Sequence, residues 1–257
     1  MTSPLRMLVL GHSDSDGTRL ADAADSWPQV VAREIPGPSI ELTHRILLPG
    51  RSATTFVEKE LAASTPDIVV VAVSSFSAVF EFVSNRLRDL LGERAASVAV
   101  RLEHLAGDLT VSNQRLHGAT IAPRRAARWL LGTRPASTVE ATLGSYRGVL
   151  LRLAREENVQ TIVFGGKGYT RYHETMNPRM RAITDRFSVE VKQMAEDHRF
   201  DWLFHEALLR GPDARDRFFL PDGVHTNVRS HRLVADAMMP LITARWGGLV
   251  RNGPRGL

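Results

Sequence analysis

Cysteine is absent from this chain of 257 residues. Its absence excludes disulfide bonds, thiolate nucleophiles and cysteine-ligated metal sites. The histidines do not replace it, because no pair shows a metal-ligand spacing such as H-E-x-x-H. We therefore expect no metal and assign surface or core roles to seven of the nine histidines, namely His44, His104, His117, His173, His198, His205 and His231.

Long apolar runs are also absent, so no segment of the sequence is suited to span a bilayer. The first six residues lack the apolar core of a signal peptide before an apolar strand begins at Met7. The sequence predicts a soluble cytoplasmic protein with no membrane partner, and it leaves the oligomeric state open.

Lysine is scarce, and Lys59, Lys167 and Lys192 are its only occurrences. The net charge of +5 and the pI of about 10.2 therefore come from arginine. Arginine suits carboxylates and phosphates, so one interpretation is an anionic substrate or partner; the other is genome composition. Because no known nucleic-acid-binding module accompanies the arginines, we expect no nucleic-acid partner.

Short apolar runs alternate with helical stretches, which favours a parallel sheet with crossover helices. With 43% hydrophobic residues, the chain can bury its core as a single α/β domain over residues 1–257. The expected strands are Met7–Leu10, Glu41–Ile46, Ile68–Val73, Thr161–Phe164 and Trp202–Phe204. The expected helices are Trp27–Arg33, Thr54–Ala63, Thr138–Glu157, Met180–His198 and Ser230–Arg245.

The two ends of the chain carry the residues of a serine nucleophile system. Ser13 follows the first apolar strand, and Asp222 precedes His225 by three residues. A serine hydroxyl needs an imidazole to take its proton, and the imidazole needs a carboxylate to fix its tautomer. A tight Asp-Gly turn can bring Asp222 and His225 to one side of a loop. We predict that Ser13 attacks, His225 transfers the proton and Asp222 orients His225, with no cofactor.

These motifs resemble the SGNH (GDSL-type) serine hydrolases. Gly11-His12-Ser13 is similar to the family's Gly-Asp-Ser block, Ser26-Trp27-Pro28 to the Trp-Pro that follows it, and Asp222 with His225 to its Asp-x-x-His block. Gly50 looks like the glycine of the second block. The resemblance implies a three-layer α/β/α sandwich with a central, mostly parallel five-stranded sheet, as in flavodoxin-like folds. It also implies an acyl-enzyme on Ser13 and a small-molecule ester or acyl substrate.

Two blocks depart from the family pattern. After the third strand, Ser74-Ser75-Phe76-Ser77 stands where the family has Gly-x-Asn-Asp, and Phe76 aligns with the asparagine that donates to the oxyanion. The backbone N–H groups of Ser13 and Gly50 are then the expected oxyanion donors, with help from a hydroxyl of Ser74, Ser75 or Ser77. In the first block, His12 replaces the family's aspartate; it either contacts the oxyanion or makes a structural hydrogen bond.

The stretch of residues 76–137 exceeds the length of one crossover and is predicted to be a helical, arginine-rich insertion that sets substrate choice. Apolar and cationic residues occur together in it, which would suit an anionic or carrier-bound acyl group; a solvated basic helix is the alternative. The residues concerned are Phe80, Phe82, Arg115, Pro123, Arg124, Arg125, Arg128 and Trp129.

Two other motifs are incomplete. Gly11 to Ser15 approaches the G-x-S-x-G elbow of α/β-hydrolases, yet the second glycine is missing and the serine follows the first strand. Gly165-Gly166-Lys167-Gly168 lacks the full phosphate-loop spacing, and we interpret it as a strand-end turn beside Tyr169. Two alternatives to a hydrolase stay open: an acyltransferase of specialised metabolism that uses the same triad, and a binding protein on this fold that has lost catalysis.

Overall fold

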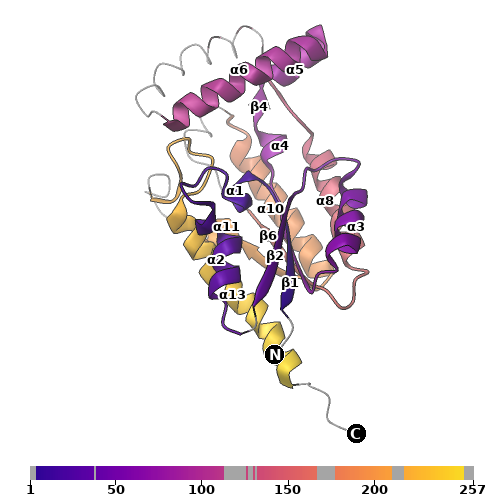
Figure 1. The fold of residues 1–257 in the computed structure, drawn as a ribbon. Helices are drawn as coiled ribbons and strands as arrows, with labels where there is room; N and C mark the ends of the chain where they lie inside the picture. The colour runs from indigo at the N-terminus through magenta and orange to yellow at the C-terminus, as the bar shows by residue number, and fades with distance from the viewer. Residues whose placement is uncertain are drawn as a thin grey trace.

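Five parallel strands form one sheet in the order β2-β1-β3-β6-β7 (Figure 1). The structure is a computed structural model that describes residues 4–37, 39–112, 126, 130, 132–166, 177–209 and 217–251. Successive strands run outward to one edge of the sheet from β1 to β2 and to the other edge from β3 to β7. Open α/β sheets bind ligands at the carboxyl ends of the strands where this order changes, which here are β1 and β3. The strands are β1 (Leu5–Gly11), β2 (Ile40–Ile46), β3 (Ile68–Ala72), β6 (Gln160–Gly165) and β7 (Asp201–Phe204).

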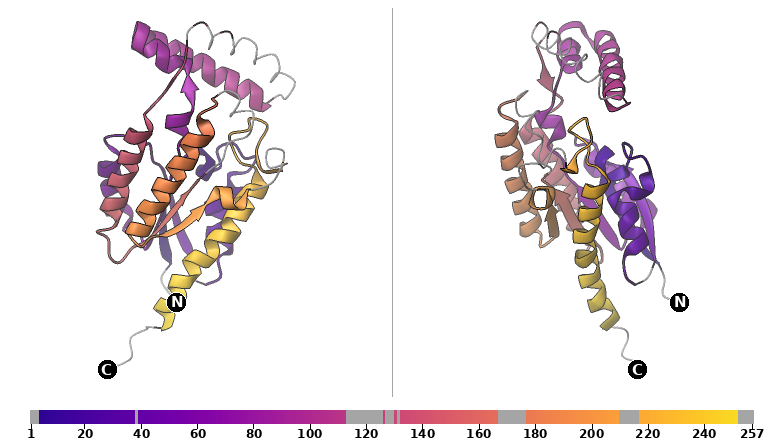
Figure 2. Two further views of the ribbon diagram at one scale, coloured as in Figure 1. Left: turned by 180° about the vertical axis from the view of Figure 1, so that it is seen from behind. Right: turned by 90° about the vertical axis from the view of Figure 1, so that its left-hand side faces the viewer.

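Helices cover both faces of the sheet, because side chains alternate between its two faces along each strand. Leu8 and Leu10 of β1 pack with apolar residues of α3 (Ala53–Ser64), α8 (Val139–Leu153) and α10 (Met180–Asp197). Met7 and Val9 face the opposite layer, built by α2 (Trp27–Glu34) and α13 (Val228–Arg251). The two views in Figure 2 show these helices on either side of the sheet, which makes the three-layer α/β/α sandwich that was predicted.

All five predicted strands and all five predicted helices are present, and most of their boundaries shift by one or two residues. The larger differences are the end of α8 and the end of α13, which runs to Arg251 rather than Arg245. The helix predicted to reach Glu157 ends at Leu153, because backbone bonds from Ala154 and Glu156 back to α8 turn the chain toward β6. The helix predicted to begin at Ser230 begins at Val228. There the Asn227 side chain accepts a hydrogen bond from the Ser230 N–H at 3.1 Å, which satisfies a free donor of the first turn.

The described part of residues 76–137 adds a helical hairpin beyond the carboxyl end of the sheet (Figures 1 and 2). Two helices form it, α5 (Val83–Leu91) and α6 (Glu93–Ser112), joined at Gly92, which has a positive φ of 81°. Before and after it lie α4 (Phe76–Val79), β4 (Glu81–Phe82) and β5 (Arg134–Pro135), of which β4 and β5 pair antiparallel. The predicted cluster of Arg115, Pro123, Arg124, Arg125, Arg128 and Trp129 lies outside the described residues.

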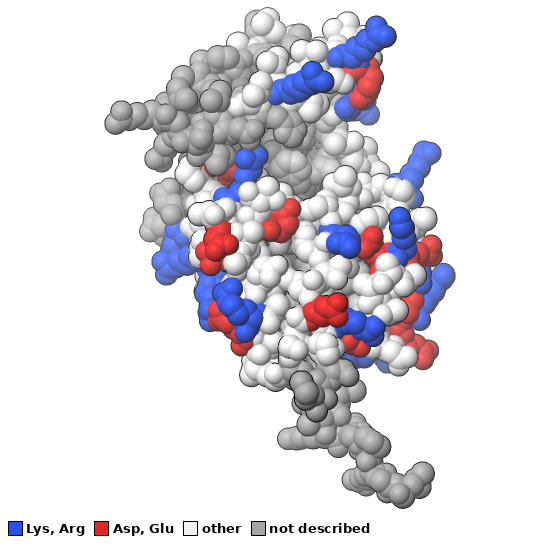
Figure 3. Space-filling view, viewed as in Figure 1, with Lys and Arg blue, Asp and Glu red and all other residues white. Residues whose placement is uncertain are grey.

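Acidic and basic side chains are interspersed over the described surface that faces the viewer in Figure 3. Many arginines pair with carboxylates, as Arg152 does with Glu156 and Arg186 with Glu190. No helix in the described part of the chain combines the length and the apolar character needed to cross a bilayer. Short elements complete the fold: α1 (Ser13–Asp16), η1 (Ala23–Asp25) and α11 (His205–Leu208).

Candidate active site

Ser13 lies at the carboxyl end of β1, as the first residue of α1. The turn depends on Gly11, because a Cβ there would lie 1.9 Å from the Ser15 hydroxyl oxygen. Ser15 is buried and ties the turn together: its hydroxyl accepts from the His12 N–H at 2.9 Å and lies 3.1 Å from Nε2 of His44. The neighbouring serine, Ser13, is exposed. The local fold therefore buries one serine as structure and presents the other to substrate.

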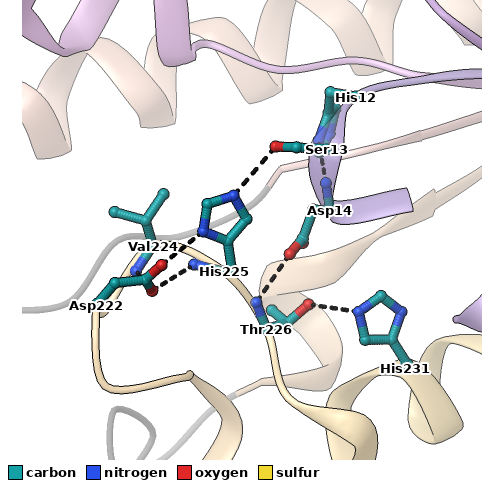
Figure 4. A network of polar contacts seen from close by, with 8 residues as sticks. All are labelled: His12, Ser13, Asp14, Asp222, Val224, His225, Thr226 and His231. Carbon is teal, nitrogen blue, oxygen red and sulfur yellow. Dashed lines mark hydrogen bonds and ion pairs between the residues drawn. The ribbon is translucent and has the colours of Figure 1, made fainter. Parts of the chain in front are cut away.

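His225 faces Ser13 from a loop at the other end of the chain (Figure 4). Its Nε2 lies 3.1 Å from the Ser13 Oγ, and its Nδ1 lies 2.6 Å from Oδ2 of Asp222. The second carboxylate oxygen of Asp222 accepts the backbone N–H groups of Val224 at 2.9 Å and His225 at 3.0 Å. Gly223, with φ of 67°, makes the tight turn between them. The structure thus brings Ser13, His225 and Asp222 into one hydrogen-bonded chain.

The charge of Asp222 is held by this loop. Burial raises the pKa of the carboxyl, but the hydrogen bond and charge of His225 and the two backbone N–H donors outweigh burial, so the pKa lies below its ordinary value. Asp222 is therefore ionised at neutral pH. An ionised Asp222 accepts a hydrogen bond from the Nδ1–H group and leaves Nε2 of His225 as the acceptor toward Ser13.

A second set of polar contacts joins the nucleophile turn to the histidine loop, and the sequence carries no indication of a role for two of its members, Asp14 and Thr226. Asp14, 7% exposed, accepts the Thr226 N–H at 2.8 Å (Figure 4). The Thr226 hydroxyl lies 3.3 Å from Nε2 of His231, whose Nδ1 accepts the Trp27 N–H at 3.1 Å. His231 is buried and thus has a core role, as expected. Trp27 of the Ser-Trp-Pro segment contributes to the site by donating its N–H to His231.

The expected oxyanion donor at Gly50 is engaged elsewhere. Its N–H donates to the Ser145 hydroxyl at 2.8 Å, and that hydroxyl lies 3.2 Å from the Gly50 carbonyl oxygen, to which it can donate. Ser145 of α8 therefore accepts the hydrogen bond that we expected the Gly50 N–H to donate to the oxyanion, and the structure differs from this expectation. Sequence spacing gave no signal, because Ser145 is 95 residues away.

Ser74 follows β3 at the position that matches Ser13 after β1, since Leu10 pairs with Val71 in the parallel register. Its N–H donates to the Tyr146 hydroxyl at 3.1 Å, so this backbone amide is engaged as well. Its side-chain oxygen accepts the Phe76 N–H at 3.2 Å, which leaves the hydroxyl proton for another acceptor. The other two hydroxyls face neighbouring threonines, Ser75 toward Thr184 and Ser77 toward Thr142.

His12 makes the structural hydrogen bond that was predicted as one of its two roles, and its contact with an oxyanion stays a prediction. It is the N-cap of α1, and its Nδ1 accepts the Asp14 N–H at 3.4 Å. Phe76, at the aligned asparagine position, stacks on Phe80 with ring centroids 4.4 Å apart and remains 38% exposed. An apolar side chain thus stands where the resemblance implies a polar donor.

Among the remaining predicted features, the two described glycines at the end of β6 contribute packing. Gly165 and Gly166 pack closely, because a Cβ on either would lie 2.3 Å from Val73 or Phe204, whereas Lys167, Gly168 and Tyr169 lie outside the described residues. In the described ranges, no group of three or more histidine, aspartate or glutamate side chains is arranged to hold a metal ion.

Known proteins resemble this chain in structure but not in sequence. No family model matches the chain, and no curated protein matches it in sequence. Axe2, an acetylxylan esterase from Geobacillus stearothermophilus, is similar in structure with a TM-score of 0.54 at 16% identity over 92% of this chain and 93% of its own. A G-D-S-L family protein from Desulfitobacterium hafniense gives 0.54 at 9% identity, over 91% of this chain and 98% of its own.

The esterase EstA from Pseudoalteromonas sp., solved with monoethylphosphonate as inhibitor, gives a TM-score of 0.54 at 13% identity. The match covers 94% of this chain and 98% of that one. These similarities extend over nearly the whole length of each chain. Together with the strand order and the two helical layers, they show that this chain has the SGNH (GDSL-type) hydrolase fold.

Proposed function

We propose that the protein is a serine hydrolase that cleaves a carboxylic ester or a related acyl group through an acyl-enzyme on Ser13. The observation that supports this most strongly is the continuous chain from Ser13 Oγ to His225 Nε2 at 3.1 Å and from His225 Nδ1 to Asp222 at 2.6 Å. Both distances lie within the range for a nucleophile, its base and the group that orients the base.

The reaction proceeds in two half-reactions. In the first, Ser13 Oγ bonds to the acyl carbon while its proton passes to Nε2 of His225, and the same proton then leaves with the alcohol as the ester C–O bond breaks. In the second, His225 takes a proton from water as the water oxygen bonds to the acyl carbon, and the bond from the acyl carbon to Ser13 Oγ then breaks while His225 returns the proton to Oγ, which releases the carboxylic acid. The ionised Asp222 stabilises the imidazolium in both steps.

The oxyanion is assigned to the Ser13 N–H and the Ser74 hydroxyl. Within the described residues, the Ser13 N–H makes no hydrogen bond to the protein. The Ser74 oxygen accepts from the Phe76 N–H, so its hydroxyl proton is available to donate to an oxyanion. A third donor, the Gly50 N–H, becomes available only when Ser145 releases it. Removing one donor from a working oxyanion site typically costs about 10²–10³ in turnover, so we expect the turnover number of this hydrolase to be low.

Hydrolysis of p-nitrophenyl acetate by the wild-type chain and by Ser13→Ala tests this proposal. We expect turnover by the wild type and loss of nearly all of it in Ser13→Ala, with an unchanged urea unfolding midpoint. A wild-type rate equal to that of Ser13→Ala would contradict the hydrolase and would favour the binding protein that has lost catalysis.

Acyl transfer is the second candidate, favoured by the apolar surface that Phe76 and Phe80 form after β3. An apolar site admits less water, so an alcohol or amine acceptor competes better for the acyl-enzyme. Product analysis with such an acceptor present and absent separates the two reactions: transfer predicts acylated acceptor as the main product, and hydrolysis predicts free acid in both cases.

A further inference from the structure

The Asp14 carboxylate links the two halves of the candidate site. Asp14 is joined covalently to Ser13, and its Oδ1 accepts the N–H of Thr226, which is joined covalently to His225. The bond therefore runs beside the Ser13–His225 hydrogen bond and spans the same 212 residues of sequence. Both partners are buried, with Asp14 7% and Thr226 2% exposed.

The other contacts of the histidine loop lie within the loop or join it to α13, as the Thr226 hydroxyl does with Nε2 of His231. Asp222 holds the backbone of Val224 and His225, and the Leu220 N–H donates to the His225 carbonyl at 2.7 Å. These contacts set the shape of the loop, but they do not set its distance from α1. A shift of about 1 Å of the loop and the start of α13 relative to α1 would preserve these contacts and would still misplace the imidazole, a misplacement that can cost about 10²-fold in rate.

We propose that Asp14 is a positioning residue that sets the distance between Ser13 and His225 through its bond to the Thr226 N–H. The proposal rests on the proposed function, because it concerns the same nucleophile and base. What matters here is the length and acceptor capacity of the side chain, since a hydrogen bond to an N–H requires an oxygen at that place whether or not it is charged.

Two substitutions separate position from charge. Asp14→Asn removes the charge but keeps an oxygen of the same reach for the Thr226 N–H. Asp14→Glu keeps the charge, yet its extra methylene must displace either the loop or α1 in a buried place. Asp14→Ala removes the bond altogether. Asp16→Ala, in the same short helix, is the matched control, because Asp16 accepts from Thr18 and contacts no residue of the triad.

The test measures the rate at which an alkyl fluorophosphonate labels Ser13, and kcat and KM for p-nitrophenyl acetate, with urea unfolding of each variant. We expect Asp14→Glu and Asp14→Ala to lose about 10²-fold in labelling rate and in kcat with little change in KM. Asp14→Asn should lose about tenfold or less, because a neutral acceptor bond is roughly half as strong as a charged one. Asp16→Ala should match the wild type.

Each other outcome counts against the proposal. A larger loss in Asp14→Asn than in Asp14→Glu would assign the effect to charge, and equal rates in all variants would assign Asp14 to stability alone. If Asp14→Ala does not fold, the comparison of Asn with Glu still decides. A wild-type protein that is neither labelled nor active would remove the proposed function itself, and with it this role for Asp14, whereas a labelled wild type with indifferent variants would remove only the role of Asp14.

Discussion

Replacing Asp222 by asparagine should reverse the tautomer of His225. In the loop, one Asp222 oxygen accepts two backbone N–H groups, from Val224 and His225, and the other faces Nδ1 of the imidazole. In Asp222→Asn the amide oxygen must stay toward the two backbone donors, because an NH₂ group there would face two N–H groups. The NH₂ group then points at Nδ1 and donates to it.

The consequence follows from the position of one proton. With Nδ1 as acceptor, the neutral ring carries its proton on Nε2, which lies 3.1 Å from Ser13 Oγ. The base then has no lone pair for the serine proton. Loss of the correct tautomer costs about 10⁴ in turnover in a serine triad, which corresponds to about 5 kcal/mol of transition-state stabilisation. Stability should fall by only about 1.5–3 kcal/mol, the usual contribution of one charged hydrogen bond, because the two backbone contacts remain.

The assay compares kcat/KM for p-nitrophenyl acetate with the free energy of unfolding in urea. Asp222→Ala is the companion variant, because it removes all three contacts of the carboxylate. It should lower both kcat/KM and the free energy of unfolding, and the free energy of unfolding should fall further than in Asp222→Asn. If Asp222→Asn keeps its activity within tenfold of the wild type, Asp222 does not set the tautomer and the reasoning is refuted.

Three further predictions follow from the same geometry. Ser13→Ala and His225→Ala should each reduce kcat by several powers of ten, and the double variant should be little worse, because triad members act as a unit; additive losses in the same ester assay would show that the two residues do not share a step. Phe76→Asn should raise turnover of a simple ester if asparagine restores an oxyanion donor, and unchanged or lower turnover would mean that the donors lie elsewhere. Because folding lowers the pKa of Asp222, its contribution to stability is present above the unfolded value of about 3.9 and is lost as the pH falls through the folded value. The stability difference between wild type and Asp222→Asn, measured in urea, should therefore shrink below about pH 4, and a constant difference down to pH 3 would contradict the lowered pKa.

The fold could be predicted because the local spacing of apolar residues marks the strands and helices that build its core. Strands such as β3 are short apolar runs, and α2 and α10 show the spacing of helices with one buried face. The short elements could not be predicted: α1 has four residues, and β4 and β5 have two each. Elements of that length form only because tertiary contacts hold them, and a local pattern carries no information on such contacts.

The site divides along the same line. Ser13, Asp222 and His225 could be proposed because their residue types and local spacing already imply the chemistry. Asp14 and Ser145 could not, since each acts through a backbone group far away in sequence, Thr226 in one case and Gly50 in the other. A backbone N–H is present at every residue except proline, so the residue type of a partner gives no hint of such a bond.

The most direct measurement of the central claim is the mass of the intact protein after incubation with an alkyl fluorophosphonate, followed by peptide mapping of the modified residue. The account predicts one phosphonyl group per chain, located on Ser13, and no addition to the His225→Ala variant on the same timescale. An unmodified wild-type chain, or an adduct on any residue other than Ser13, would contradict it.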